Sequence, residues 1–252
     1  MKLPFCYVCG KEFTKLDQAT RDHVPPSACF AGKDRNSSSA LLLPVHRSCN
    51  HGHHLDDELV GQLVSLAHGR VPKPQDRRLK IIRHSDGITS PRRFGVTGVD
   101  VEGEICLWVR GFHAALYREP LLATAFSITT PFPTSRPTPA GQQVTPIRPQ
   151  HRKFVEIIKV NRAAATVDCL SAWGRKLRYE CAWVQSDQRP WVCIFALDLY
   201  AWKRLGHVEG LADRGCVGCY VLRSGNRPGT AAEGAKLLAP ALNREPLDPF
   251  GL

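Results

Sequence analysis

The sequence lacks any run of about 20 apolar residues, which is the length that a helix needs to cross a bilayer. Its N-terminal stretch, Met1 to Cys6, also lacks the apolar segment that a secretory signal contains. We therefore expect no membrane span and no export, and we assign the protein to the cytoplasm.

Acidic residues are scarce relative to basic ones. The 252 residues include 34 Lys and Arg but 23 Asp and Glu, which gives a formal net charge of +11. Such an excess favours a polyanionic partner, nucleic acid first. Two alternatives stay open: a basic surface that only keeps the chain soluble, or one that binds a protein partner, whose binding would not depend on salt concentration. The sequence leaves the oligomeric state unknown.

The rest of the composition is that of a folded protein, with 43% hydrophobic and 23% charged residues. These fractions exclude a wholly disordered chain. A chain of this length buries roughly three quarters of its unfolded surface, so it can fold without disulfides or metals.

Hydrophobic periodicity predicts two helices. In residues 56–68, apolar side chains recur at intervals of three and four, which is typical of a helix with one buried face. Residues 152–162 predict a second, shorter helix. Residues 105–118 mix apolar and basic groups, and their pattern does not assign them to helix or strand.

Strands are predicted in the C-terminal half. Residues 177–185 and 191–199 are apolar runs separated by a short polar turn that contains proline, so we expect a hairpin. Residues 219–223 predict a further strand. Helices and strands together indicate an α+β fold.

Ten cysteines in a chain without an export signal indicate a reducing compartment, where disulfides are rare. Cys6 and Cys9 form a Cys-x2-Cys pair, and His46 and Cys49 have the same spacing. Together they supply the three sulfurs and one imidazole of a tetrahedral structural zinc site. The alternative is that these thiols are buried and bind nothing. We expect Cys29 to be a packed side chain.

Two further motifs accompany these pairs. Residues 22–26 read Asp-His-Val-Pro-Pro, and residues 43–50 read Leu-Pro-Val-His-Arg-Ser-Cys-Asn. Because the prolines restrict the preceding backbone, we expect His23 on the edge of a strand or loop. In order, spacing and chemistry, these motifs resemble the HNH endonuclease family over about residues 5–60. They are most similar to a subgroup with His-Val-Pro-Pro and an Asp-Asp-Glu run, here residues 56–58.

The resemblance implies a metal-dependent endonuclease built on a ββα-metal unit. His23 would be the general base that takes a proton from the attacking water, a task that suits an imidazole near neutral pH. A catalytic divalent cation, Mg²⁺ first, would be held by Asp22 and Asn50. The substrate would be nucleic acid, DNA in preference to RNA. Further candidate ligands or supporting groups are His53, His54 and Asp57.

Two positions differ from the family pattern. His46 stands where the family usually has Cys, and imidazole ligates zinc equally well. Leu41 stands near the middle Asn of the family name and cannot make its hydrogen bond, so Ser38 or Ser39 would have to orient His23. Leu41 is the best support for an alternative, a catalytically inactive zinc-stabilised module that binds nucleic acid.

A basic run at residues 71–95 predicts contacts to phosphates that position the nucleic acid without reading its sequence. A solvated surface is the alternative. The side chains that we expect to contact nucleic acid are Arg47, Arg77, Arg78, Lys80, Arg83, Arg92 and Arg93.

A rival motif lies in the C-terminal half. Residues 207–209 (His-Val-Glu) and 216–219 (Cys-Val-Gly-Cys) resemble the signature of zinc nucleobase deaminases. The interval between them is too short for the elements that separate the two pieces in that fold, and residue 215 is Gly instead of Pro. We expect no deaminase. A second small zinc site with His207, Cys216 and Cys219 stays open beside simple buried thiols.

These observations predict five parts of an α+β protein. They are a zinc-knuckle HNH module at 1–70, a basic connecting region at 71–130, a proline-rich loop or linker at 131–150, an α+β region at 151–223 and a loosely ordered tail at 224–252.

Overall fold

The computed structural model describes residues 2–30, 40–67, 80–84, 93–97, 100–129, 149–173, 177–187, 189–199 and 216–229. Helices and strands are mixed, which confirms the α+β class. Among the helices of these ranges, none has the length and apolarity that a membrane span requires.

The elements are β1 (Ala19–His23), η1 (Ser27–Cys29), β2 (Leu42–His46), α1 (Arg47–Ala67), β3 (Lys80–His84), β4 (Arg93–Thr97), α2 (Val101–Tyr117), β5 (Ala123–Thr129), α3 (Pro149–Ala163), β6 (Asp168–Ala172), β7 (Leu177–Val184), β8 (Val192–Leu199) and β9 (Cys216–Leu222).

Several predictions concern residues outside the described ranges, and they stay predictions. Lys80, Arg83 and Arg93 lie in β3 and β4, of which the backbone alone is described. The predicted positions that lie wholly outside are Arg77, Arg78, Arg92, Ser38, Ser39 and His207, with most of the proline-rich loop and of the C-terminal tail.

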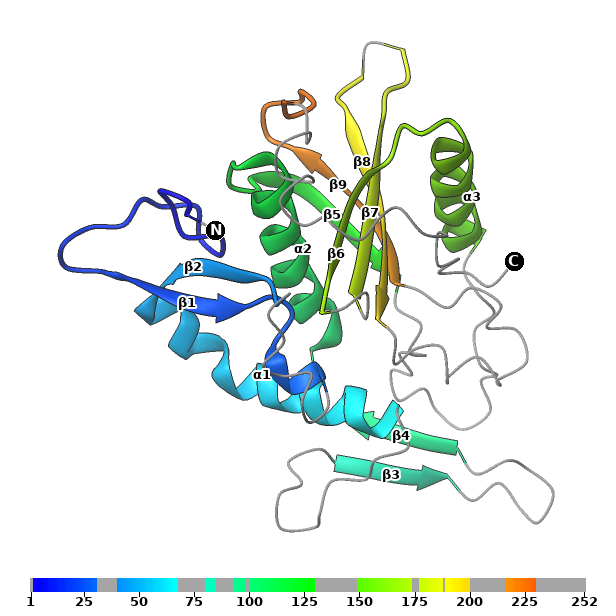
Figure 1. Cartoon of the computed structure of the whole chain (residues 1–252). Coiled ribbons are helices and arrows are strands. Elements are labelled where there is room, and N and C mark those ends of the chain that lie inside the picture. The colour runs from blue at the N-terminus through cyan, green and yellow to red at the C-terminus, as the bar shows by residue number, and fades with distance from the viewer. Residues whose placement is uncertain are drawn as a thin grey trace.

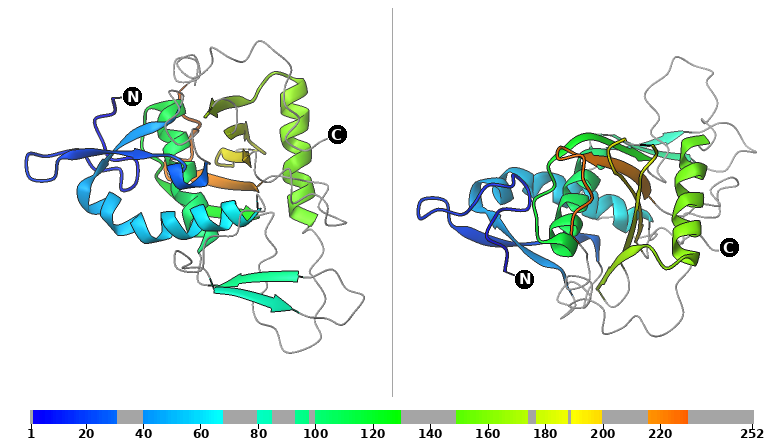
Figure 2. Two further views of the ribbon diagram at one scale, coloured as in Figure 1. Left: turned by 60° about the horizontal axis from the view of Figure 1, so that its bottom comes forward. Right: turned by 90° about the horizontal axis from the view of Figure 1, so that it is seen from above.

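The largest sheet has five antiparallel strands in the order β5-β9-β8-β7-β6. Figures 1 and 2 show four layers: the β1–β2 hairpin with α1, then α2, then this sheet, then α3. Side chains alternate between the two faces of a strand, so Phe195 packs on the α2 side while Ile194 packs on the α3 side. Because helices cover both faces, β7 and β8 are buried along nearly their whole length.

Helix α2 lies in the middle of the molecule, between the β1–β2 hairpin and the sheet (Figure 1). Asp100 begins it, with its Oδ1 accepting a hydrogen bond from the backbone N–H of Gly103 at 3.0 Å. Every residue of α2 from Gly111 to Leu116 is buried, so this part of the helix has no side that faces solvent. A helix that is apolar on most sides has no amphipathic stripe, which explains why periodicity did not assign residues 105–118.

One hydrophobic core connects the N-terminal and C-terminal parts of the chain. It extends from Leu3 to Leu222, at the end of β9. Trp173, the residue after β6, is 1% exposed and stacks on Phe30, with ring centroids 4.3 Å apart and planes 10° apart. The N-terminal elements therefore pack directly on the sheet, and the predicted domain boundaries stay a prediction.

Helix α1 begins at Arg47, so the predicted start at Asp56 is wrong. The first turns of α1 are rich in polar residues, and His51 and Gly52 are exposed, so no apolar stripe marks them. Farther along the helix, Val60 and Val64 are each 2% exposed, as the periodicity predicts.

The predicted hairpin is confirmed: β7 and β8 pair antiparallel, with Leu177 opposite Leu199. Helix α3 includes the predicted residues 152–162. Strand β9 begins at Cys216, three residues before the predicted start. Strands β5 and β6 were not predicted.

Two glycines of α1 provide a matched test of the packing between α1 and η1. A Cβ atom at Gly61 would lie 2.4 Å from the Cβ of Ala28, whereas one at Gly52 would meet nothing within 4 Å. Gly52→Ala should stabilise the protein by up to about 1 kcal/mol through helix propensity. Gly61→Ala should destabilise it by about 1–3 kcal/mol through overpacking. Urea unfolding of the two variants measures both values, and equal stabilisation by both would contradict the described contact.

Candidate metal centre

The first half of the centre is a tight turn that contains Cys6 and Cys9. The backbone N–H of Gly10 donates to the carbonyl of Cys6 at 2.8 Å, and the N–H of Cys6 donates to the carbonyl of Lys11 at 2.9 Å. Gly10 has a φ of +76°, a conformation that glycine adopts without strain. The turn therefore brings the two sulfurs to one side of the backbone.

The second half is the junction of β2 and α1. His46 is the last residue of β2, and Cys49 lies in the first turn of α1. The ligand atoms of Cys6, Cys9, His46 and Cys49 all lie within 4.8 Å of one another. The structure thus brings together all four predicted ligands in a cluster that can hold a metal ion, and three sulfurs with one imidazole are a donor set that zinc favours.

The orientation of His46 fits a role as ligand. Its Nδ1 lies 3.3 Å from the Sγ of Cys9, and its Nε2 lies 3.2 Å from the carbonyl oxygen of Glu12. An Nε2–H that donates to this carbonyl leaves the Nδ1 lone pair for the metal. Phe13 packs its ring at 4.9 Å from the imidazole, and His46 is 4% exposed.

The electrostatics of the cluster also favour a cation. Burial, followed by the charges of Cys6 and Cys9, raises the pKa of Cys49 to about 12. Burial acts in the same direction on Cys9, but the Lys11 N–H and the contact with His46 lower the pKa of Cys9 below its ordinary value. The raised pKa of Cys49 shows that negative charge on its sulfur is disfavoured beside Cys6 and Cys9, and a bound divalent cation would remove that repulsion.

Tyr7 connects this cluster to Asp22. It lies between Cys6 and Cys9 in the sequence, and its hydroxyl donates to the Oδ2 of Asp22 at 2.5 Å. Tyr7 is 5% exposed, and burial, followed by the charge of Asp22, raises the pKa of Tyr7 well above its ordinary value. The turn that contains Cys6 and Cys9 therefore fixes the position of a carboxylate on β1.

The other predicted catalytic residues lie on neighbouring elements. Register pairs Asp22 with Leu43 and His23 with Leu42. Successive side chains of a strand point to opposite faces, but His23 is the last residue of β1, and at a strand end both side chains can border one site. The half-buried His23 ring lies 6.3 Å from the ring of Trp173. Asn50 is half-buried in the first turn of α1, and no hydrogen bond or ring contact in the described ranges joins it to His23.

Four further residues near the centre were singled out by the sequence, and the structure describes the side chains of two of them. Arg47 is exposed at the start of α1. His53 and His54 lie in α1, and their backbone alone is described. Leu41, near the family's middle Asn, is 2% exposed in the hydrophobic core, where it packs as an apolar side chain.

Glu104 on α2 was missed by the sequence analysis. It is 4% exposed, and its Oε2 has no hydrogen-bond partner among the described residues. Burial, followed by the charges of Asp57, Asp56, Asp100 and Asp22, raises the pKa of Glu104 to about 8. The available signal was a carboxylate within the otherwise apolar run that forms α2.

The remaining cysteines do not form a second centre in the described ranges. Cys216 and Cys219 are three residues apart on β9, so they face opposite sides of the sheet. Cys216 packs in the core that contains α2, whereas Cys219 packs on the α3 side. Cys29 is 2% exposed, which confirms the expected packed side chain.

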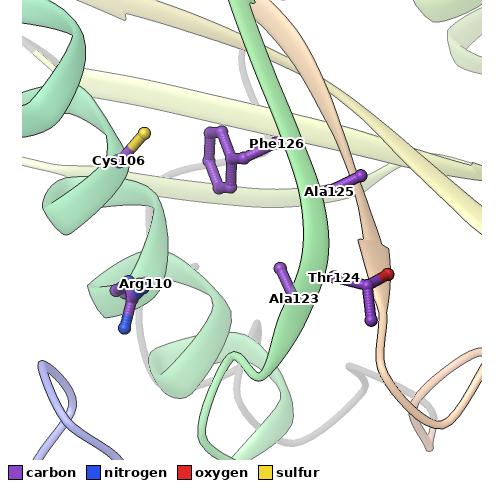
Figure 3. A pocket seen from close by; sticks show the side chains of 6 residues that line it. All are labelled: Cys106, Arg110, Ala123, Thr124, Ala125 and Phe126. Atoms are coloured by element: carbon purple, nitrogen blue, oxygen red, sulfur yellow. The ribbon is translucent and has the colours of Figure 1, made fainter.

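A cavity of about 180 Å³ lies between α2 and β5 (Figure 3). Arg110 lines this cavity, and its guanidinium donates a hydrogen bond to the carbonyl oxygen of Val8 at 2.8 Å. Burial raises the pKa of Cys106 to about 11, which leaves this thiol protonated and unreactive at neutral pH.

Comparisons of the chain with protein-family models, with curated proteins and with solved structures find no match.

The metal cluster makes a direct prediction. The purified protein should carry about one tightly bound zinc ion per chain, and Cys49→Ala should lose it, whereas His46→Cys should keep it because thiolate replaces imidazole in such sites. Elemental analysis after dialysis measures the content. Cys219→Ala, which removes a sulfur outside the cluster, is the control and should retain the full zinc content. Full zinc in Cys49→Ala would exclude the cluster.

Glu104 predicts a dependence of stability on pH. A raised pKa means that the folded chain binds this proton more tightly than the unfolded chain, so stability falls as pH rises from about 4.5 to about 8 and is level above that. Without added divalent cation, the Tm of the parent should therefore fall relative to that of Glu104→Gln as the pH rises from about 6 to about 8. Glu102→Gln changes an exposed carboxylate on the same helix, and its difference from the parent should stay constant. If the Tm of the parent and the Tm of Glu104→Gln changed equally with pH, the raised pKa of Glu104 would be contradicted.

Proposed function

We propose that the protein is a metal-dependent endonuclease of the HNH type, which hydrolyses phosphodiester bonds in nucleic acid, DNA in preference to RNA. The observation that carries this proposal is the Tyr7 to Asp22 hydrogen bond. It connects the predicted catalytic Asp-His pair on β1 to a metal-binding cluster, half of which comes from the following strand and helix.

Each residue has a distinct role in this proposal. Zinc in the four-residue cluster holds the N-terminal turn against the β2–α1 junction. Asp22 and Asn50 hold a hard divalent cation, Mg²⁺ first, because both supply oxygen ligands. The chemistry that a bound Mg²⁺ supplies is stabilisation of negative charge on the phosphate and on the departing 3′ oxygen.

His23 acts as the general base. Its imidazole takes a proton from a water molecule whose oxygen forms the new bond to phosphorus, while the bond from phosphorus to the 3′ oxygen breaks. The neighbouring ring of Trp173 limits the orientations open to the imidazole. Arg47, exposed beside the metal cluster, contacts a backbone phosphate.

A second candidate is a zinc-stabilised nucleic-acid-binding module without catalysis. The buried position of Leu41 favours it, because an apolar side chain there cannot orient a general base through a hydrogen bond. Mg²⁺-dependent cleavage of plasmid DNA that EDTA abolishes separates the two candidates. Binding that weakens with salt, without any cleavage, would support the second.

The role of His23 is tested by a matched pair of histidine variants. His23→Ala should lower plasmid cleavage by about 100-fold to 10,000-fold, which is the usual loss for a general base. His51→Ala removes an exposed imidazole from α1 and should cleave at the rate of the parent. Zinc content and Tm should match the parent in both. Cleavage by His23→Ala at the parental rate would rule out the proposed base.

A further inference from the structure

The turn formed by residues 14–17 presents a leucine at its tip. Leu16 is 100% exposed, whereas two other large apolar side chains on the surface, Leu122 and Val160, are 47% and 58% exposed. Figure 1 shows the dark blue loop before β1, which contains this turn, extending away from the other elements, and both views in Figure 2 agree. Leu16 therefore has no packing role within the described part of the chain.

Hydrogen bonds hold the backbone of this turn. The N–H of Thr14 donates to the carbonyl of Asp17 at 3.4 Å, and the N–H of Asp17 donates to the Oγ1 of Thr14 at 3.1 Å. Single exposed apolar side chains are common on protein surfaces, but here bonds on both sides of Leu16 fix its backbone. A side chain on a fixed turn loses less entropy when it inserts into a partner.

The side chain of Asp17 joins the turn to the start of α1. The hydroxyl of Ser48 donates to the Oδ2 of Asp17 at 3.4 Å, and the same oxygen lies 3.9 Å from the Nε2 of His46. Leu16 comes directly before Asp17, and the exposed Arg47 comes directly before Ser48. The leucine and the guanidinium therefore belong to neighbouring parts of one surface beside the metal cluster.

Cations outnumber anions on this surface. Glu12 and Asp17 are its acidic residues, and Asp17 is hydrogen-bonded to Ser48. The exposed basic side chains of the same region are Lys11, Lys15, Arg21 and Arg47. A positively charged surface with an apolar tip is complementary to a nucleic acid, whose phosphates are anionic and whose stacked bases are apolar.

A duplex fits this surface better than a single strand. Proteins bind single strands by stacking bases on aromatic side chains, but Phe13, the aromatic residue nearest to Leu16 in the sequence, packs on the ring of His46. The minor groove of a duplex is only about 6 Å wide, so it admits the tip of a turn. Leucine is one of the side chains that enter this groove and partly unstack a base step.

We propose that Leu16 is a wedge that inserts between base pairs from the minor groove of a bound duplex, while Lys15 and Arg47 contact phosphates beside it. This inference rests on the nucleic-acid partner proposed above, but it does not require cleavage. The wedge belongs to a turn that contacts the metal cluster, so it holds the duplex at the end of the molecule where His23 and Asp22 lie.

The test uses the full chain with its zinc retained, without added Mg²⁺, so that the duplex is not cleaved. The probe is a short DNA duplex with 2-aminopurine at a flexible TA step, because the fluorescence of this base rises when it unstacks. The parent should raise the fluorescence. Leu16→Gln should lose the rise and bind about 10-fold to 100-fold more weakly, which is the effect of no longer burying one leucine.

Two further variants are controls. Leu16→Met keeps an apolar side chain that can act as a wedge, and it should retain both the affinity and the fluorescence rise. Val160→Ala shortens an exposed apolar side chain on α3, which lies on the far side of the sheet (Figure 2), and it should bind like the parent. Because Leu16 is fully exposed, its substitution disturbs no packing, and an unchanged Tm checks this.

The dependence of binding on salt separates the wedge from its charged neighbours. Lys15→Ala and Arg47→Ala should each reduce the slope of log affinity against log salt by about one, because each removes one phosphate contact. Leu16→Gln should weaken binding without a change in this slope, and a changed slope would contradict insertion of an apolar side chain.

The outcomes separate this inference from the nuclease proposal. Parental affinity or a parental fluorescence rise in Leu16→Gln overturns the wedge, as does a parent that binds the duplex without unstacking it. The nuclease proposal survives these results if the parent cleaves DNA with Mg²⁺. A parent that binds no duplex at low salt overturns the wedge and both candidate functions. Unstacking that depends on Leu16 in a protein that cleaves no DNA supports the wedge and refutes the nuclease.

Discussion

The convergence of three sulfurs and one imidazole on a point is the constraint on which the N-terminal part of the protein depends. The two ligand pairs lie far apart in sequence, and they meet because a tight turn and a strand–helix junction each present two ligands. A metal bound there would turn these local geometries into a long-range crosslink and would stabilise the segment. Tyr7, inside the turn, donates a hydrogen bond to Asp22 and so links the position of this carboxylate to the turn.

Helix α2 has a second organising role, because it contacts both the hairpin and the five-stranded sheet. Its burial unites two parts of the chain that composition alone would separate. Trp173 after β6 lies beside His23, with ring centroids 6.3 Å apart, so the surroundings of the Asp22-His23 pair include a side chain from outside the segment that carries the motifs. Arg110 strengthens the connection, because it reaches from α2 to the carbonyl of Val8 in the metal-binding turn.

Sequence reasoning succeeded where the signal is local. The spacing of Cys6, Cys9, His46 and Cys49 predicted the cluster, because a Cys-x2-Cys turn or a strand–helix junction defines ligand geometry within four residues. Helix α3 and the β7–β8 hairpin followed from their own periodicity. The same reasoning placed the start of α1 too late and left α2 unassigned, because polar first turns and all-round burial both remove the amphipathic stripe. Glu104 could not be found in this way, since its burial arises only from tertiary packing.

The strand order of the sheet has a consequence for how the protein is made. Strand β9 lies between β5 and β8, so Ala123 finds its partner Leu222 only after about a hundred further residues have been synthesised. Until β9 has been synthesised, the backbone edges of β5 and β8 that pair with it have no hydrogen-bond partner. Such exposed strand edges favour misassembly. The metal-binding turn and the β2–α1 junction, in contrast, are complete as soon as the first fifty residues have emerged. The order of synthesis therefore allows the N-terminal centre to form first, while the sheet beneath α2 closes last.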